Sequence, residues 1–153
     1  MMSVSSLKAQ ISVGPGVVYG TNIASIGASA NASYDITPRI SVLGAYGYFF
    51  NTVQYADGSN SNWWTLDANA SYKCYKTSAE SDIFVLSGVN FIYFKSASAL
   101  GSLTGIYNRL LGANIGVGWK LKMGNKNDLI PEVRYTLGDL NFLRFEVKFM
   151  FGI

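Results

Sequence analysis

The stretch Asn141-Phe-Leu-Arg-Phe-Glu-Val-Lys-Phe-Met-Phe-Gly-Ile153 decides how this chain folds. From position 143 onward apolar residues recur at every second position, whereas Arg144, Glu146 and Lys148 occupy positions between them. Because successive side chains of a β-strand point to opposite faces, this alternation predicts a strand with one apolar face and one polar, charged face. Such a strand needs two different surroundings, and the rest of the sequence indicates what they are.

The same alternation recurs along most of the chain. It is regular in the second, fourth, sixth and seventh of eight segments separated by turn residues, and ambiguous in the third and fifth, where both faces carry aromatic or large aliphatic residues. Segments of about 10 residues can cross a bilayer as tilted strands. The sequence therefore predicts an all-β chain that forms an eight-stranded antiparallel up-and-down transmembrane β-barrel. The expected strands run Gln10–Gly20, Ser25–Thr37, Ile40–Tyr55, Trp63–Lys76, Ile83–Phe94, Arg109–Met123, Leu129–Leu137 and Asn141–Ile153.

The connections between these strands alternate in length. Thr37–Arg39, Thr77–Asp82 and Gly124–Asp128 are short and polar, whereas Ala56–Asn62 and Lys95–Asn108 are longer and rich in serine and glycine. Short turns on one side and longer loops on the other are typical of bacterial outer-membrane barrels, in which the short turns are periplasmic. This pattern places both termini on the periplasmic side.

The composition agrees with a membrane barrel and excludes several other classes. Charged residues make up 14% of the 153 residues, against roughly 25% in soluble domains. No apolar run reaches the roughly 18 residues of a transmembrane helix. The net charge is only +3 and the basic residues do not cluster, so the sequence does not indicate nucleic-acid binding. The lone Cys74 excludes an internal disulfide and a multi-cysteine metal site.

The first nine residues are set apart from the barrel. Residues 1–9 read MMSVSSLKA, which is consistent either with the end of a cleaved signal peptide, with Ala9 at the cleavage position, or with a disordered N-terminus. A full apolar signal core is missing. The barrel domain is therefore expected over residues 10–153.

Alternation alone does not decide which face lies inside, so a soluble lipocalin-like barrel is an alternative. The polar face, however, consists mainly of Gly, Ser and Asn, which suit a narrow lumen better than a solvated surface. The chain is also poor in the Lys and Glu that keep such a surface soluble. An apolar face turned to outer-membrane lipid is favoured.

Aromatic residues concentrate near the ends of the expected strands, where membrane interfaces favour them because their rings have an apolar body and a polar edge. An outer belt and a periplasmic belt are expected. The outer belt includes Tyr19, Trp63, Trp64 and Tyr93, and the periplasmic belt includes Tyr34, Tyr72 and Trp119.

Charges at inward positions are expected to pair, because an eight-stranded barrel is just wide enough to be filled by its own side chains. Strand order places Glu132 near Lys120 and also near Arg144 or Lys148, Glu146 near Arg134, and Asp67 across the lumen from Arg144 or Arg134. We expect a salt-bridged plug, with a gated ion or water path as the alternative. The expected network comprises Asp67, Lys120, Glu132, Arg134, Arg144, Glu146 and Lys148.

The chain resembles the OmpA/OmpX-type small outer-membrane barrels, in particular the outer membrane protein β-barrel domain of Bacteroidetes-like bacteria. The hairpin Leu129–Leu140 and the closing strand carry the resemblance. The C-terminal residues Phe149, Phe151 and Ile153 look like the signal that the barrel-assembly machinery reads during insertion, although the chain ends on Ile rather than Phe. The resemblance implies a location in the bacterial outer membrane.

The absence of histidine from the sequence bears on whether the protein is an enzyme. Outer-membrane barrel enzymes resemble one another in using a histidine base or acid, and this chain has none. A Ser-His or Asp-His arrangement therefore cannot be built. No cofactor or metal is expected either. The sequence predicts a non-enzymatic structural or surface-interaction protein, or a subunit of an outer-membrane complex, with a narrow OmpW-like channel as the alternative.

Overall fold

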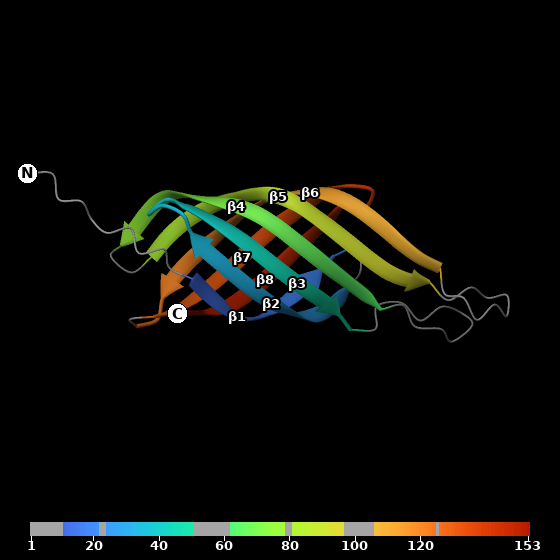
Figure 1. The fold of residues 1–153 in the computed structure, drawn as a ribbon, viewed down its shortest axis with the longest axis horizontal. Coiled ribbons are helices and arrows are strands. Elements are labelled where there is room, and N and C mark those ends of the chain that lie inside the picture. The colour runs from blue at the N-terminus through green and yellow to red at the C-terminus, as the bar shows by residue number, and fades with distance from the viewer. Residues whose placement is uncertain (1–10, 22–23, 51–61, 79–80, 97–105, 125) are drawn as a thin grey trace, which may run out of the picture.

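Eight antiparallel strands form a closed barrel in the computed structural model (Figure 1). The structure describes residues 11–21, 24–50, 62–78, 81–96, 106–124 and 126–153. Each strand pairs with the next along the chain, and β8 pairs with β1 to close the sheet. The fold class expected from the alternation is confirmed. The strands are β1 (Ile11–Gly20), β2 (Ser25–Asp35), β3 (Ile40–Phe49), β4 (Trp63–Ser78), β5 (Ser81–Ser96), β6 (Ile106–Lys122), β7 (Asn127–Gly138) and β8 (Phe142–Gly152).

The strand boundaries differ from the expected ones mainly in the middle of the chain. β4 to β6 are 16 to 17 residues long, whereas the other strands have 10 to 12. β3 ends at Phe49, so the expected extension of this strand to Tyr55 lies mostly outside the described residues. The expected signal remnant at residues 1–9 also lies outside them. The described part of the chain contains no helix suited to spanning a membrane.

The two ends of the barrel are distinguished by what connects the strands there. Ser12 pairs with Gly152, so β1 begins and β8 ends at the same end of the barrel, which we call the terminus end. The turn from β2 to β3 lies at this end, where Ile36 and Thr37 donate backbone hydrogen bonds to Ile40. At the opposite end, which we call the loop end, β3 ends beside the start of β4 and β5 ends beside the start of β6 (Figure 1).

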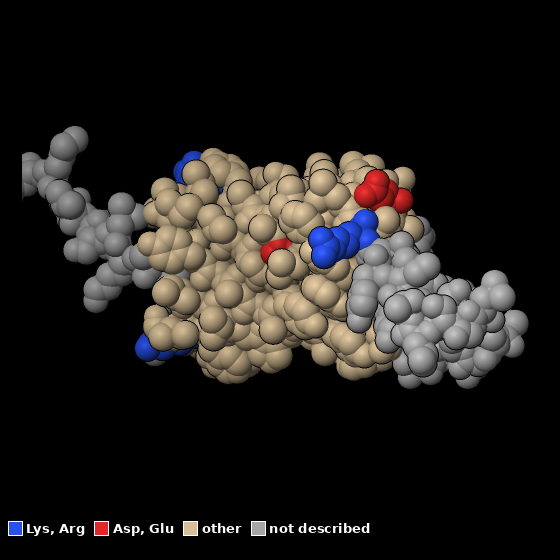
Figure 2. Space-filling view, turned by 45° about the vertical axis from the view of Figure 1, so that its right-hand side comes forward, with Lys and Arg blue, Asp and Glu red and all other residues tan. Residues whose placement is uncertain are grey.

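Apolar side chains cover the outside of the wall. Val17, Ile26, Leu111 and Ile115 are each more than half exposed, and similar residues continue around the barrel. In Figure 2 the described wall is mostly tan, and most of the blue and red side chains lie toward its ends. Large contiguous apolar surfaces of this kind are rare on soluble monomers. The barrel therefore has the polarity opposite to that of a soluble lipocalin-like barrel, which would bury its apolar face.

Side chains fill the interior in three layers. At the loop end an apolar cap, formed by Val18, Phe49, Ile92 and Phe142, is almost completely buried, with Trp63, Leu110 and Leu140 packed against it. A charged layer occupies the middle. Near the terminus end, two partly exposed ion pairs join Asp35 to Lys73 and Lys120 to Asp128.

The seam between β1 and β8 is tight. Its ladder runs from Ser12 to Val13, skips Gly14 and Pro15, and resumes at Gly16. Pro15 has no N–H to donate to a ladder. A Cβ on Gly14 would lie 1.8 Å from the carbonyl oxygen of Phe149, so only glycine allows β8 to approach this closely.

Candidate functional site

The candidate site is a group of six charged residues in the middle of the lumen, which we call the central ion cluster. Strand alternation turns all six inward, Asp67 from β4 and the others from the β7–β8 hairpin. In the pairing of β7 with β8, Glu132 lies opposite Glu146 and Arg134 opposite Arg144. Like charges directly opposite each other repel, so the cluster depends on contacts between opposite charges along each strand and diagonally between the strands. Its members are Asp67, Glu132, Arg134, Arg144, Glu146 and Lys148.

Contacts along each strand and diagonally across the hairpin join opposite charges. Along β7, Arg134 donates from Nε and Nη2 to Glu132, and diagonally its Nη2 lies 3.8 Å from Glu146 Oε2. Along β8, Arg144 Nη2 lies 3.5 Å from the same Glu146 oxygen. Diagonally, Lys148 Nζ donates to Glu132 Oε2 at 2.6 Å. Glu132 and Glu146 therefore each contact two cations.

Asp67 links the hairpin to the opposite wall. Arg144 Nη2 donates to Asp67 Oδ2 at 2.6 Å, and Arg134 Nη1 lies 3.2 Å from Asp67 Oδ1. Asn90 and Asn114 donate to Oδ1 at 2.6 and 2.8 Å. With three acids and three bases the cluster is neutral, as burial of charged groups requires. The ion-paired side chains of Asp67, Arg134 and Arg144 are at most 2% exposed.

Lys120 lies outside the cluster, and the expected contact between Lys120 and Glu132 is wrong. Lys120 Nζ instead lies 3.0 Å from Asp128 Oδ2. Gly118 lies opposite Glu132 and Lys122 opposite Asp128, so Lys120 is diagonal to both acids, and it contacts Asp128. Lys148 and Arg134 take the Glu132 carboxylate. Of the two partners expected for Glu132 on β8, the contact is with Lys148.

The polar neighbours of the cluster were not expected from the sequence. Asn90 and Asn114 support Asp67, Thr65 Oγ1 accepts from Arg144 Nη1 at 3.2 Å, and Ser29 Oγ donates to Glu146 Oε1 at 2.6 Å. The sequence held a signal for one of them, Asn114. Asparagine recurs at inward positions of β2, β4 and β6 after an alanine, which places amides at similar depths around the lumen.

Comparisons with known proteins agree on the architecture. No family model matches the chain, and no curated protein matches it in sequence. Among solved structures, the N-terminal β-barrel domain of Pseudomonas aeruginosa OprF matches with a TM-score of 0.74, over 94% of this chain and 97% of that chain at 13% identity. The chain has the fold of the small outer-membrane β-barrels.

Two further outer-membrane barrels match over almost their whole length. Neisserial surface protein A matches with a TM-score of 0.66 at 14% identity, covering 95% of this chain and 96% of that chain. Ail of Yersinia pestis, in complex with the heparin analogue sucrose octasulfate, matches with a TM-score of 0.64 at 12% identity, covering 95% and 97%. At these identities the outer-membrane barrel fold is shared, and the central ion cluster has to be interpreted from this chain alone.

The aromatic residues expected in the two belts lie on the outer face of the barrel, with one exception. Trp64 and Tyr93 stack at 4.0 Å on the outer face near the loop end, with Arg109 over the Tyr93 ring. Trp63 does not belong to this belt, so its expected interface role is wrong. It shares the inward face of β4 with Thr65, stacks on Phe94 at 4.6 Å and packs against the apolar cap. The other belt residues are exposed on the outer face: Tyr19, Tyr34, Tyr72 and Trp119.

The C-terminal residues also lie on the outer face. Phe149 and Phe151 form an edge-to-face pair with ring centroids 4.9 Å apart, and Ile153 is 77% exposed. At this end of β8, every second residue thus has an apolar side chain that is accessible from outside the barrel. Recognition of Phe149, Phe151 and Ile153 by the barrel-assembly machinery remains a prediction.

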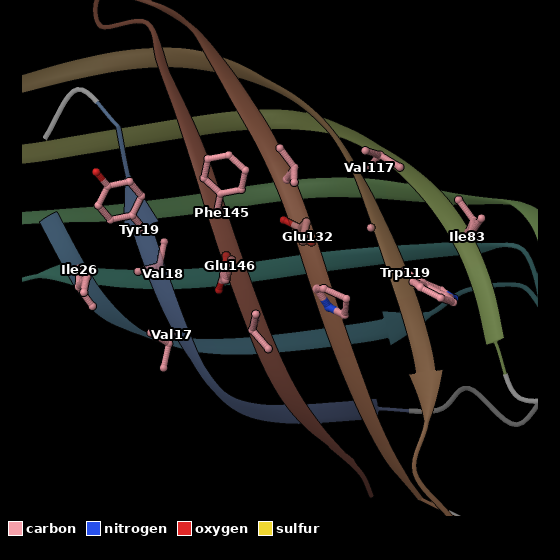
Figure 3. A pocket seen from close by; sticks show the side chains of 14 residues that line it. Val17, Val18, Tyr19, Ile26, Ile83, Val117, Trp119, Glu132, Phe145 and Glu146 are labelled. Carbon is pink, nitrogen blue, oxygen red and sulfur yellow. The ribbon is translucent and has the colours of Figure 1, made fainter. Parts of the chain in front are cut away.

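The described wall carries a depression of about 630 Å³ across β1, β6, β7 and β8 (Figure 3), and another of about 440 Å³ beside Ile40, Tyr72 and Ile115. Short side chains such as Val17, Val133 and Val147 line the larger depression, and Tyr19 and Trp119 lie at its sides. Glu132 and Glu146 also border it but are only 3% exposed, because their carboxylates contact groups in the lumen. The depression is part of the apolar outer surface and presents no polar recognition group.

Proposed function

We propose that this protein is a non-enzymatic integral barrel of the bacterial outer membrane, with periplasmic termini and a lumen closed by its own side chains. It acts as a structural or surface-interaction protein, alone or as a subunit of an outer-membrane complex. The observation that carries this proposal is the combination of an apolar outer wall with a neutral, fully buried ion cluster inside. Outer-membrane lipid is its immediate partner.

The closed lumen is supported by the little space that the side chains leave. Two cavities of about 20 and 30 Å³ lie between the central ion cluster and the terminus end, which is room for about one or two water molecules each. The cluster spans the lumen from β4 to β8 through the pair of Asp67 and Arg144. A solute larger than water would have to displace both this pair and the apolar cap.

A non-catalytic role is supported by how the carboxylates are used. Glu132 and Glu146 are the acids that could serve as a catalytic pair, and each contacts two cations. The chain has no histidine to act with a nucleophile. Among the described residues, no acidic, histidine or cysteine side chains are grouped so as to hold a metal ion.

Planar-bilayer recording separates the closed barrel from a narrow channel. We expect the wild-type protein to give no steady single-channel steps after insertion, because the cluster and the cap both obstruct the lumen. Recovery of folded protein from the same membranes controls for insertion. Uniform steps in the wild type that disappear in Arg144→Ala would contradict the plug and support a channel through the cluster.

Tryptophan fluorescence tests the membrane location and the side-chain directions together. The chain has three tryptophans, so three single-tryptophan variants with phenylalanine at the other two positions can be refolded into vesicles with brominated acyl chains. Trp64 and Trp119, which lie on the outer face, are expected to be quenched, whereas Trp63 faces inward and is expected to remain fluorescent. A soluble barrel would show no quenching at any of them.

A further inference from the structure

We infer that the lumen is a blind water inlet, in which water enters from the terminus end as far as Glu132 and Lys148 and the apolar cap seals the other end. This inference rests on the proposed membrane barrel. In this arrangement the apolar cap is the layer that excludes water, and the central ion cluster forms the inner end of the water-accessible part of the lumen.

The charged groups become less exposed along the lumen in one direction. Near the terminus end, the side chains of Asp35 and Lys73 are each 20% exposed, and those of Lys120 and Asp128 are 15% and 11% exposed. In the central ion cluster, Lys148 is still 5% exposed, whereas Asp67 is completely buried. A route bordered by charged groups, and also by the apolar side chains of Leu43, Phe84 and Ile130, therefore leads inward from the terminus end and closes gradually.

Two small cavities lie along this route. The outer one, of about 30 Å³, is bordered by Asp35, Lys73 and Lys120, and the inner one, of about 20 Å³, by Asn69, Glu132 and Lys148. Their linings share Ser33, Leu43, Phe84 and Ile130, so the cavities are neighbours.

The inner cavity also offers unused hydrogen-bonding groups. Asn31 Oδ1 and Asn69 Nδ2 are buried, border this cavity and have no hydrogen-bond partner among the described residues. Buried polar atoms without a protein partner are commonly satisfied by ordered water where the cavity is polar and large enough. A water molecule in this cavity could donate to Asn31 Oδ1 and accept from Asn69 Nδ2, and so bridge the two side chains.

The loop end provides no such route. Val18, Phe49, Ile92 and Phe142 are at most 1% exposed and form one apolar cluster, with Trp63, Leu110 and Leu140 packed against it. A closely packed apolar layer excludes water because water would lose its hydrogen bonds there. The apolar cap is thus the layer of the lumen least able to admit an ion.

Two serines on the inner face of β2 allow a matched test. Ser33 borders both cavities, whereas Ser29, one inward position beyond Asn31, bonds to Glu146. Ser33→Cys and Ser29→Cys are made in a Cys74→Ser background, because the Cys74 thiol is exposed. The folded proteins are treated with silver ion, which is similar to water in size, and the thiols that remain are titrated after unfolding.

The thiol of Ser33→Cys is expected to be lost, and that of Ser29→Cys to be retained until Phe142→Ala is added to open the cap. Loss of neither thiol, or equal loss of both before the cap is opened, would overturn the inference, as would retention of the Ser29→Cys thiol after Phe142→Ala. None of these results would contradict the proposed function. That proposal fails instead if the wild-type protein conducts ions, or if Trp64 and Trp119 are not quenched.

A measurement on the wild-type chain keeps the test valid if a cysteine variant does not fold. The side-chain amides of Asn31 and Asn69 border the inner cavity, whereas those of Asn90 and Asn114 are bonded to Asp67. Magnetization transfer from water in NMR spectra is expected at Asn31 and Asn69 and not at Asn90 and Asn114. Equal transfer at all four amides, or at none, would contradict the inlet.

Discussion

Replacing Asp67 with alanine is expected to lower the free energy of unfolding by about 3–5 kcal/mol, the usual cost of removing one partner from a buried ion pair. Asp67 contacts both Arg134 and Arg144, at 3.2 and 2.6 Å, closer than Glu146 lies to either arginine. Without it the cluster has three cations and two anions in a layer from which water is largely excluded. Asn90 and Asn114 also lose their acceptor.

Urea unfolding in detergent micelles, followed by tryptophan fluorescence, measures this change. Asp35→Ala is the matched control, since Asp35 also faces the lumen and pairs with a lysine but is partly exposed. It is expected to cost less than about 1 kcal/mol, as partly hydrated pairs do. Equal losses in the two variants would show that the central cluster contributes no more to stability than the partly exposed pair.

Replacing Gly14 with alanine is expected to hinder closure of the barrel. The added Cβ would lie 1.8 Å from the carbonyl oxygen of Phe149, an approach that neither backbone can accommodate without moving. Forcing a methyl group into a packed site typically costs about 1–3 kcal/mol. The effect here is expected at the upper end or beyond, because the obstructing atom is backbone at the β1–β8 seam.

The folded fraction after dilution from urea into detergent, read from the mobility of unheated samples on gels, measures the effect. Gly44→Ala is the matched control, because a Cβ on Gly44 meets no atom within 4 Å. It is expected to refold like the wild type. A Gly14→Ala variant that refolds equally well would mean that the seam can separate at this point without loss.

The sequence predicted the strands and their faces well, because alternation depends only on the chain itself. Arg144, Glu146 and Lys148 face inward as their positions in β8 require. The contact of Asp67 with Arg144 and Arg134 also followed from strand order, since β4 lies opposite β8 in a ring of eight.

The diagonal contacts could not be predicted in the same way. Lys120 and Lys148 are both diagonal neighbours of Glu132, one on β6 and one on β8, so strand register alone does not decide which of them contacts it. Lys120 also has Asp128 within reach and pairs with that acid instead. Trp63 was misplaced for a different reason. Its position near a strand end favoured a membrane belt, but alternation from Thr65 turns it inward onto the apolar cap.

The division of charge within the central ion cluster also constrains the order of folding. To the cluster the β7–β8 hairpin contributes Arg134, Arg144 and Lys148 against Glu132 and Glu146, and the third carboxylate, Asp67, comes from β4. Burying cations without enough anionic partners is costly. The charges of the cluster balance only when the sheet curves far enough to bring Asp67 across the lumen. Charge balance therefore couples the last hairpin to the first half of the chain and favours assembly of the barrel as one cooperative unit.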